Sequence, residues 1–261
     1  MRLGVDKITD LDSRGLVWLV GASSGIGRAL ALRLASDGWR VLVSARRREG
    51  LQGLAELAPA GRISVYPLDV TDPEKVHEVV DCIERDAGAI DIAILNAGDY
   101  EPMALDSFDA ALFRRLMEVN YLGVVHCLEA LLPVMRPRGR GQILVTASVA
   151  GYRGLPLAGP YGASKAALIN LAESLHPELA RSGINLRVIN PGFVDTPLTR
   201  KNRFTMPFLM TPEDAARRII TQLDRGGFEI SFPRIFVWML KVLRCLPYRL
   251  YFFLIRRMTG T

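Results

Sequence analysis

Short apolar segments alternate with helical patterns along most of the chain. Leu16 to Val20 is a continuous apolar run, which is typical of a strand covered on both faces, and a helix with apolar spacing follows it. Six further strands are predicted in the same rhythm, at 40–45, 62–68, 91–95, 141–147, 184–190 and 228–232. This alternation predicts an α/β fold, a single doubly wound parallel sheet of about seven strands with helices on both faces.

The composition supports one main domain. At 261 residues and 49% hydrophobic content, the chain is long enough to bury a large core under a single α/β sheet. We expect that domain to span 15–233. A polar lead-in at 1–14 precedes it, and an apolar and basic helical extension at 234–261 follows it.

The first predicted strand runs directly into a glycine-rich turn. Its glycines allow a tight turn and a close approach of the backbone to a phosphate, and the following helix begins with free N–H groups. A tight strand-to-helix connection can use the same glycines without a ligand, but the position after a buried strand and before a long helix favours a dinucleotide. The turn consists of Gly21, Ala22, Ser23, Ser24, Gly25, Ile26 and Gly27.

The end of the second predicted strand bears on the type of dinucleotide. No Asp or Glu stands near Ala45, where an acidic residue would bind an unmodified ribose, and Arg46 and Arg47 follow instead. Arginine there accommodates a 2′-phosphate, so the sequence predicts NADP(H) in preference to NAD(H). The alternative is that these arginines simply begin a solvated helix.

Other polar residues also fall where predicted strands end. They include Asp69, Asn96, Ser148 and the segment that begins at Pro191. Ligands of open parallel sheets bind beyond the carboxyl ends of the strands, so the fold would collect these residues along one rim.

Tyr161 and Lys165 are four residues apart in a predicted helix at about 160–180 and would share one face of it. A phenol has a reference pKa of about 10, and a close ammonium lowers an acid's pKa by roughly 1–3 units. The pair would then suit acid and base catalysis at neutral pH. An isolated pair of this kind is more often a solvated contact, but Ser148 lies thirteen residues upstream.

Taken together, these motifs closely resemble those of the short-chain dehydrogenase/reductase family. The resemblance extends from about Leu16 to Phe232. The matching motifs are VGASSGIG at 20–27, DV at 69–70, NAG at 96–98, VN at 119–120, Ser148, YGASK at 161–165 and PGFVDT at 191–196.

The resemblance implies a Rossmann-like fold and hydride transfer between a nicotinamide and a carbonyl or alcohol. Tyr161 would be the acid or base, Ser148 would bind the substrate oxygen, Lys165 would lower the tyrosine pKa, and Asn120 would hold a proton-relaying water. It also implies a homodimer or homotetramer. The cofactor would be bound by Gly21, Ser23, Ser24, Gly25, Ile26, Gly27, Arg46, Arg47, Asp69, Val70, Asn96, Ala97, Gly98, Tyr161, Lys165, Pro191, Gly192, Val194 and Thr196.

Several other functions are disfavoured. The net charge is +6, but the basic residues form no stripe interleaved with aromatic residues, so we expect no nucleic-acid binding. The three cysteines are far apart and the three histidines fall in separate predicted helices, so no metal site is expected. The first residues lack the apolar run of a secretion signal, which favours a cytoplasmic location.

The C-terminal extension is apolar from 235 to 255 except for Lys241, Arg244 and Arg249. Three central cations make a membrane-spanning helix unfavourable. The apolar arc is nevertheless wider than one core-facing side needs, so its surplus must be buried. Two explanations fit equally: a helical hairpin at 234–257 on a membrane surface, or burial in a homodimer or against the substrate lid.

The segment at 195–212 has the position of a mobile lid, and its apolar residues favour a hydrophobic, lipid-like substrate. Two classes of function remain. One is an NADP(H)-dependent enzyme, and the other is a non-catalytic NADP(H)-binding sensor or scaffold that acts through the extension. The complete set of Asn120, Ser148, Tyr161 and Lys165 favours the enzyme.

Overall fold

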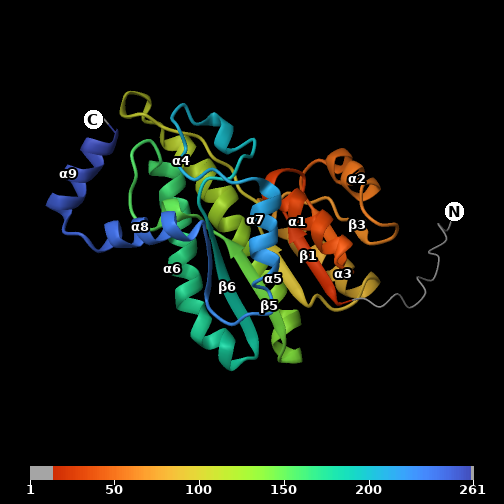
Figure 1. The fold of residues 1–261 in the computed structure, drawn as a ribbon. Helices are drawn as coiled ribbons and strands as arrows, with labels where there is room; N and C mark the ends of the chain where they lie inside the picture. Colours follow the sequence, from red (N-terminus) through yellow and green to blue (C-terminus); the bar gives the residue numbers. More distant parts are fainter. Residues whose placement is uncertain (1–13, 260–261) are drawn as a thin grey trace.

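The computed structural model describes residues 14–259, so nearly all of the predicted lead-in at 1–14 lies outside the described residues. Seven parallel strands form one sheet in the order β3-β2-β1-β4-β5-β6-β7 (Figure 1), which confirms the predicted doubly wound fold. The strands are β1 (Leu16–Val20), β2 (Arg40–Ser44), β3 (Ile63–Val65), β4 (Ile92–Leu95), β5 (Gly141–Thr146), β6 (Ile184–Pro191) and β7 (Glu229–Phe232).

Helices cover both faces of the sheet. One face carries α1 (Gly25–Ser36), α2 (Arg48–Glu56) and α7 (Pro212–Ile220). The other carries α3 (Pro73–Asp86), α5 (Gly123–Met135) and α6 (Gly159–Arg181), with α4 (Ala110–Met117) packed on α6. The extension forms α8 (Arg234–Cys245) and α9 (Tyr248–Thr259).

The central strand shows why its sequence is apolar throughout. Leu16, Trp18 and Val20 of β1 face the core under α3, α5 and α6, whereas Val17 and Leu19 face the core under α1 and α2. Successive strand residues point to opposite faces, and here both faces are buried. From β1 the strands are added toward one edge of the sheet up to β3, and from β4 they are added toward the other edge. This switch between β1 and β4 opens a crevice at their carboxyl ends.

One predicted helix differs from the structure. The sequence pattern at 107–132 is typical of a single helix, but in the structure α4 and α5 are separated by a π-helical turn, η2 (Glu118–Leu122). Such turns are frequent at functional sites. Asn120 lies within this one, and the hydrogen bonds of its buried side chain hold the turn against neighbouring elements.

The hairpin of α8 and α9 lies at the edge of the molecule opposite α2, with α9 farthest out (Figure 1). Among residues 14–259, no helix is both long enough and apolar enough to cross a bilayer.

Candidate active site

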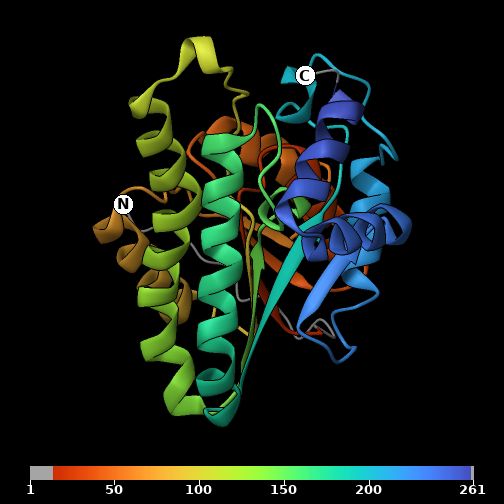
Figure 2. The same ribbon diagram turned by 90° about the vertical axis from the view of Figure 1, so that its left-hand side faces the viewer.

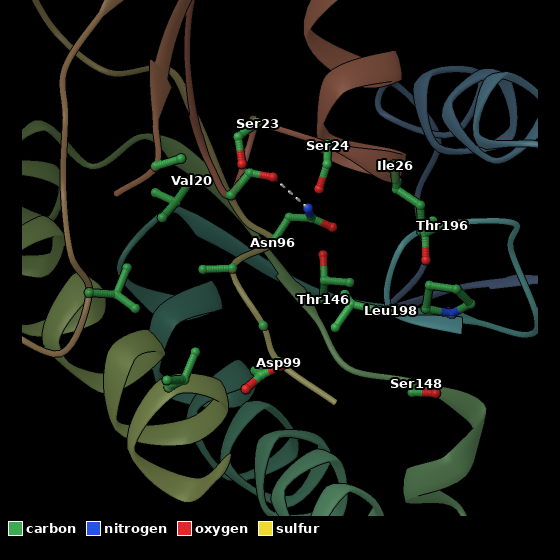
Figure 3. A pocket seen from close by; sticks show the side chains of 18 of the residues that line it. Val20, Ser23, Ser24, Ile26, Asn96, Asp99, Thr146, Ser148, Thr196 and Leu198 are labelled. Carbon is green, nitrogen blue, oxygen red and sulfur yellow. Dashed lines mark hydrogen bonds between the residues drawn. The ribbon is translucent and has the colours of Figure 1, made fainter. Parts of the chain in front are cut away.

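A cavity of about 230 Å³ lies beyond the carboxyl ends of β1, β4, β5 and β6. Figure 3 shows Ser24, Asn96, Thr146 and Thr196 gathered about the same space from four separate segments. The predicted site residues that line it are Gly21, Ser23, Ser24, Gly25, Ile26, Arg46, Arg47, Asp69, Val70, Asn96, Ala97, Gly98, Ser148, Tyr161, Lys165, Pro191, Gly192, Val194 and Thr196. Gly27 and Asn120, also predicted, lie behind this lining.

The glycine turn is held against the end of β4. Gly21 has a φ of +84°, and a Cβ on it would lie 2.6 Å from the backbone nitrogen of Ala97. A Cβ on Gly27 would lie 2.1 Å from the carbonyl oxygen of Gly21. Asn96 Nδ2 donates a hydrogen bond of 3.2 Å to that same oxygen. Gly27 therefore serves the packing of α1 beneath the turn and does not line the cavity.

The N-terminus of α1 lies at the cavity, which Ser24, Gly25 and Ile26 line. Ser24 is the N-cap residue, but its side chain makes no capping hydrogen bond, and the first turn of α1 contains no acidic residue. The first N–H groups of a helix have no partner within it and carry a partial positive charge. This donor set fits the pyrophosphate of a dinucleotide.

The two arginines that follow β2 lie at the cavity, as the sequence predicted. Arg46 and Arg47 are exposed and line the cavity beside Ser23 and Ala45. Neither arginine forms an ion pair with any side chain in the described part of the chain. Two cations that form no ion pair fit a 2′-phosphate.

Tyr161 and Lys165 both line the cavity, but their predicted effect on each other is wrong for this structure. The Lys165 ammonium is 5.7 Å from the Tyr161 ring centroid and donates a 2.8 Å hydrogen bond to the Thr146 carbonyl. Desolvation raises the pKa of Tyr161 to about 12, although a hydrogen bond with Ser148 lowers it in part. Desolvation also lowers the pKa of Lys165 to about 7. Burial thus outweighs the expected charge effect, because it favours the neutral form of both groups.

Ser148 lies at the end of β5, where the chain turns into a short 3₁₀ helix, η4 (Val149–Gly151). Its Oγ accepts a hydrogen bond of 3.2 Å from the N–H of Ala150, so the hydroxyl hydrogen stays free for another acceptor. This cap fixes the Ser148 side chain near the phenol of Tyr161.

Asn120 is buried in the π-helical turn, and its side chain is fully hydrogen-bonded. Its Oδ1 accepts from Asp99 N–H at 2.7 Å, and its Nδ2 donates to Asp99 O and to Ser164 Oγ, each at 3.0 Å. Ser164 in turn donates to the Tyr161 carbonyl at 2.7 Å. Both side-chain N–H donors of Asn120 are therefore occupied, and they tie the loop after β4 to the first turns of α6.

Further residues at or beside the cavity were not predicted from the sequence, among them Thr146, Thr199 and Tyr100. Thr146 lines the cavity, and its buried Oγ1 has no hydrogen-bond partner among the described residues. Thr199 Oγ1 donates to Val194 O at 2.5 Å and accepts from the N–H of Thr196 at 3.0 Å, which fixes the loop after β6. Only their positions near strand ends could have indicated them.

Tyr100 is also a residue that the sequence did not predict. Its ring meets the Tyr161 ring edge to face, with centroids 4.9 Å apart. Its hydroxyl donates to Asn202 Oδ1 at 2.5 Å, and its carbonyl accepts from Lys201 Nζ at 2.6 Å. Tyr100 therefore connects the segment at 195–212 to Tyr161.

Comparison with known proteins agrees with this geometry. Residues 16–206 match the family model described as short chain dehydrogenase. The chain belongs to the short-chain dehydrogenase family. Members of this family are NAD(P)-dependent oxidoreductases, so this short-chain dehydrogenase is an enzyme that binds a nicotinamide cofactor.

Two curated relatives are named uncharacterized oxidoreductases. One, from Myxococcus xanthus, is 39% identical over 226 residues, which cover 86% of this chain and 88% of the relative. The other, from Staphylococcus aureus strain USA300, is 31% identical over 207 residues, which cover 79% and 90%.

Solved structures share the fold of this short-chain dehydrogenase. A short-chain dehydrogenase from Streptomyces avermitilis superimposes with a TM-score of 0.80 at 29% identity, covering 88% of this chain and 92% of that one. ElxO with NADP bound superimposes with a TM-score of 0.75 at 26% identity, covering 83% and 97%.

Proposed function

We propose that this short-chain dehydrogenase uses NADP(H) to interconvert a carbonyl and an alcohol, with Tyr161 as the acid or base. The observation that carries the proposal is the grouping of the Tyr161 phenol, Ser148 and Lys165 at one wall of a cavity whose other walls are the glycine turn and Arg46.

In the reductive direction, Tyr161 donates its phenolic proton to the carbonyl oxygen of the substrate. Hydride is what the bound nicotinamide supplies in reduction, or accepts in oxidation. A raised pKa keeps the Tyr161 phenol protonated at neutral pH, which suits a proton donor. Ser148 Oγ donates a hydrogen bond to the same substrate oxygen and stabilises the negative charge that develops there.

Lys165 helps to restore the proton. Its pKa of about 7 lets the amine gain and lose a proton near neutral pH, and it lies on the same side of the cavity as Tyr161. Asn120 positions these groups through Ser164, and its backbone is the part left to hold a proton-relaying water.

The cofactor preference rests on Arg46 and Arg47. Both line the cavity without an acidic partner in the described chain, and they would bind the 2′-phosphate of NADP(H). The structural neighbour ElxO, named as NADP-bound, supports the same preference. Asp69 and Val70 would flank the adenine, and Thr196 with Gly192 would hold the nicotinamide end.

The substrate is proposed to be hydrophobic and lipid-like. Aromatic rings gather where the lid meets α8: Phe193 lies 5.7 Å from Phe204 and 5.6 Å from Phe236, and Phe208 lies 5.8 Å from Phe236, all between ring centroids. An apolar lid of this kind favours an apolar chain on the substrate.

We further propose one catalytic unit at 15–233, carrying the extension at 234–261 as a peripheral membrane contact, in a cytoplasmic homodimer or homotetramer. The second candidate function is a non-catalytic NADP(H) sensor or scaffold. The desolvated Lys165 argues against it, because a pure binder gains nothing from burying an amine beside a phenol.

The test is NADPH oxidation by the full chain against a panel of ketones, aldehydes and acyl-chain carbonyls. We expect turnover that rises with the apolar length of the substrate and is lost in Tyr161→Phe. NADPH binding without turnover on any of these substrates would favour the sensor.

A further inference from the structure

The helix α8 has apolar residues on two faces. Val237 is buried against the sheet. Four large apolar side chains point the other way at positions i, i+3, i+4 and i+7, which lie along one stripe of a helix. They are Ile235 at 66% exposure, Trp238 at 68%, Met239 at 41% and Val242 at 43%.

The helix α9 also carries both buried and exposed apolar residues, although its exposed ones do not follow a single stripe. Tyr251 and Ile255 are buried, at 3% and 8% exposure. The outward residues are Tyr248, Leu250, Phe252 and Phe253, each between 45% and 72% exposed. We call the eight outward residues of the two helices the hairpin face. Scattered apolar residues on a surface are ordinary, but eight large exposed ones on two successive short helices are typical of a docking surface.

The charge around the hairpin face has one sign. Residues 234–257 contain six cations and no Asp or Glu: Arg234, Lys241, Arg244, Arg249, Arg256 and Arg257. Lys241 is paired with Glu229 of β7, outside the hairpin. Arg249, Arg256 and Arg257 line one open hollow together with Phe252 and Phe253. An anionic group with apolar chains attached would match this hollow.

We propose that the hairpin face lies in the headgroup region of an anionic lipid bilayer, and that the enzyme takes its apolar substrate from that bilayer. Each helix has 12 residues. At 1.5 Å per residue that is about 18 Å, too short to cross a hydrocarbon core of about 30 Å. Trp238 and Tyr248 suit the interface, where aromatic side chains collect, and the arginines can reach the headgroup phosphates.

A second copy of the chain fits the hairpin face less well. In a two-fold dimer the same patch meets itself, so the arginines of α9 would approach the arginines of the other copy. No acidic residue within 234–257 is available to pair with them. Charge complementarity therefore favours an anionic partner.

The hairpin also contacts the loop that follows Ser148. Arg153, five residues after Ser148, donates through Nη1 to the carbonyls of Leu243, Arg244 and Leu246 at 2.6, 3.0 and 2.8 Å. Its guanidinium lies 3.8 Å from the centroid of the Tyr251 ring, and the Tyr251 hydroxyl donates to Gly154 O. The chain that follows Ser148 thus caps α8 and stacks on α9.

The lid makes the matching contact from the other side. Phe236 of α8 packs on Phe193 and Phe208, at ring-centroid separations of 5.6 and 5.8 Å. Figure 2 shows the blue hairpin on the same side of the molecule as α6, which carries Tyr161. A bilayer at the hairpin face would therefore lie close to the loop that follows Ser148 and to the lid. This second half of the proposal rests on the proposed reaction, whereas the lipid contact does not.

The test is flotation of the full chain with vesicles of phosphatidylcholine, with and without phosphatidylglycerol. We expect binding to the anionic vesicles alone. Combined Arg249→Glu, Arg256→Glu and Arg257→Glu should weaken it roughly 100-fold, since each basic residue near such a surface contributes about a fivefold factor. Combined Trp238→Ser, Phe252→Ser and Phe253→Ser should weaken it by roughly tenfold or more.

Matched controls lie elsewhere on the surface. Arg218→Glu on α7 and Leu57→Ser after α2 change an exposed cation and an exposed large apolar residue, and should leave flotation unchanged. No flotation of the full chain with anionic vesicles would overturn the proposal, and so would flotation that survives both triple substitutions. A sedimentation coefficient that falls on the aromatic substitutions, with no vesicle binding, would assign the hairpin face to a second copy.

The two proposals can fail separately. Tyr161→Phe should float like the unmodified chain while losing turnover. Turnover of a long-chain ketone should rise when anionic vesicles containing it are supplied, and should not rise for the triple arginine variant. Flotation without any such rise would leave the lipid contact standing and refute the delivery of substrate from the bilayer.

Discussion

The cofactor cavity and the hairpin depart from the usual distribution of residues in opposite directions. At the cavity, Lys165 is only 3% exposed and the Thr146 hydroxyl is buried without a partner in the described chain. On the hairpin, Trp238 is 68% exposed and Tyr248 is 72% exposed. Polar groups are enclosed in the first region, and apolar groups face outward in the second.

Each departure costs stability, so each needs a reason. Folded proteins bury apolar groups and keep charged groups in water, and exceptions concentrate where a molecule meets another one. Here the cavity suits a polar, phosphate-bearing cofactor, and the hairpin face suits an apolar, anionic surface. Arg153 binds the hairpin from the loop that follows Ser148, a residue of the cavity. The following substitutions separate their contributions.

The largest effect is expected at Tyr161. Tyr161→Phe removes the proton donor and keeps the ring, so kcat should fall by about 10²–10⁴-fold, the usual contribution of a positioned acid. NADPH binding, followed by its fluorescence, should stay within about twofold. Tyr66→Phe is the matched control, since Tyr66 lies outside the cavity lining. Equal turnover by the two variants would exclude Tyr161 as the acid.

A smaller effect is expected at the ribose end of the cavity. Arg46→Ser with Arg47→Ser should raise KM for NADPH about tenfold or more, because hydrogen bonds to a charged group contribute about 1.5–3 kcal/mol. KM for NADH should change little. Arg48→Ser, an exposed neighbour outside the lining, should leave both values unchanged. An equal rise in KM for NADH would mean that these arginines attract any anionic cofactor and do not recognise the 2′-phosphate.

At the junction between the regions, Arg153→Met removes the cap of α8 and the contact with Tyr251. We expect KM for a long apolar ketone to rise several-fold while kcat for a short one changes little. The melting temperature should fall by on the order of 5 °C, as expected for about 2 kcal/mol in a chain of this size. Arg217→Met breaks an exposed ion pair and serves as the control. An unchanged KM for the long ketone in Arg153→Met would mean that the hairpin does not influence the substrate site.

The smallest effect concerns pH and Glu229, which accepts hydrogen bonds from Tyr152, Asn190 and Lys241. Burial raises the pKa of Glu229, but these hydrogen bonds together lower it below its usual value of 4.5. The ionised group therefore stabilises the fold above about pH 4.5, and this stability is lost as the pH falls through the lower folded pKa. Glu229→Gln should reduce the free energy of unfolding at pH 7 by about 1–3 kcal/mol.

Urea unfolding of both proteins at several pH values checks this. The difference between them should shrink as the pH is lowered below about 4.5. A constant difference down to pH 3 would mean that the charge of Glu229 contributes nothing.

The fold could be predicted closely because its signals are local. The apolar run of β1 matches its observed bounds of Leu16–Val20, and the other predicted strands overlap those observed. The break between α4 and α5 could not be predicted, since hydrogen bonds from Asn120 to Asp99 and Ser164, far away in the sequence, hold the π turn.

The candidate site could be predicted in its membership but not in its electrostatics. The four-residue spacing predicted that Tyr161 and Lys165 lie side by side. Whether the pKa of Tyr161 rises or falls depends on how deeply the phenol is buried, which the spacing does not indicate. Tyr100 was missed for a similar reason. Its partner Asn202 is 102 residues away, and only the folded chain brings them together.

The hairpin stands between these cases. Its sequence showed an apolar arc too wide for one buried side, and the exposed Ile235 and Trp238 confirm that surplus. Its link to the active site through Arg153 could not be predicted, because capping carbonyls carry no sequence signature.

The most direct measurement follows a hydrogen atom. The full chain is incubated with NADPH carrying two deuterium atoms at C4 of the nicotinamide and with a long-chain ketone, and the alcohol is examined by mass spectrometry. Hydride transfer predicts one deuterium on the carbon that bears the hydroxyl group, and Tyr161→Phe should form little of this product. An alcohol without deuterium, or no alcohol from any carbonyl in the panel, would contradict the proposed reaction.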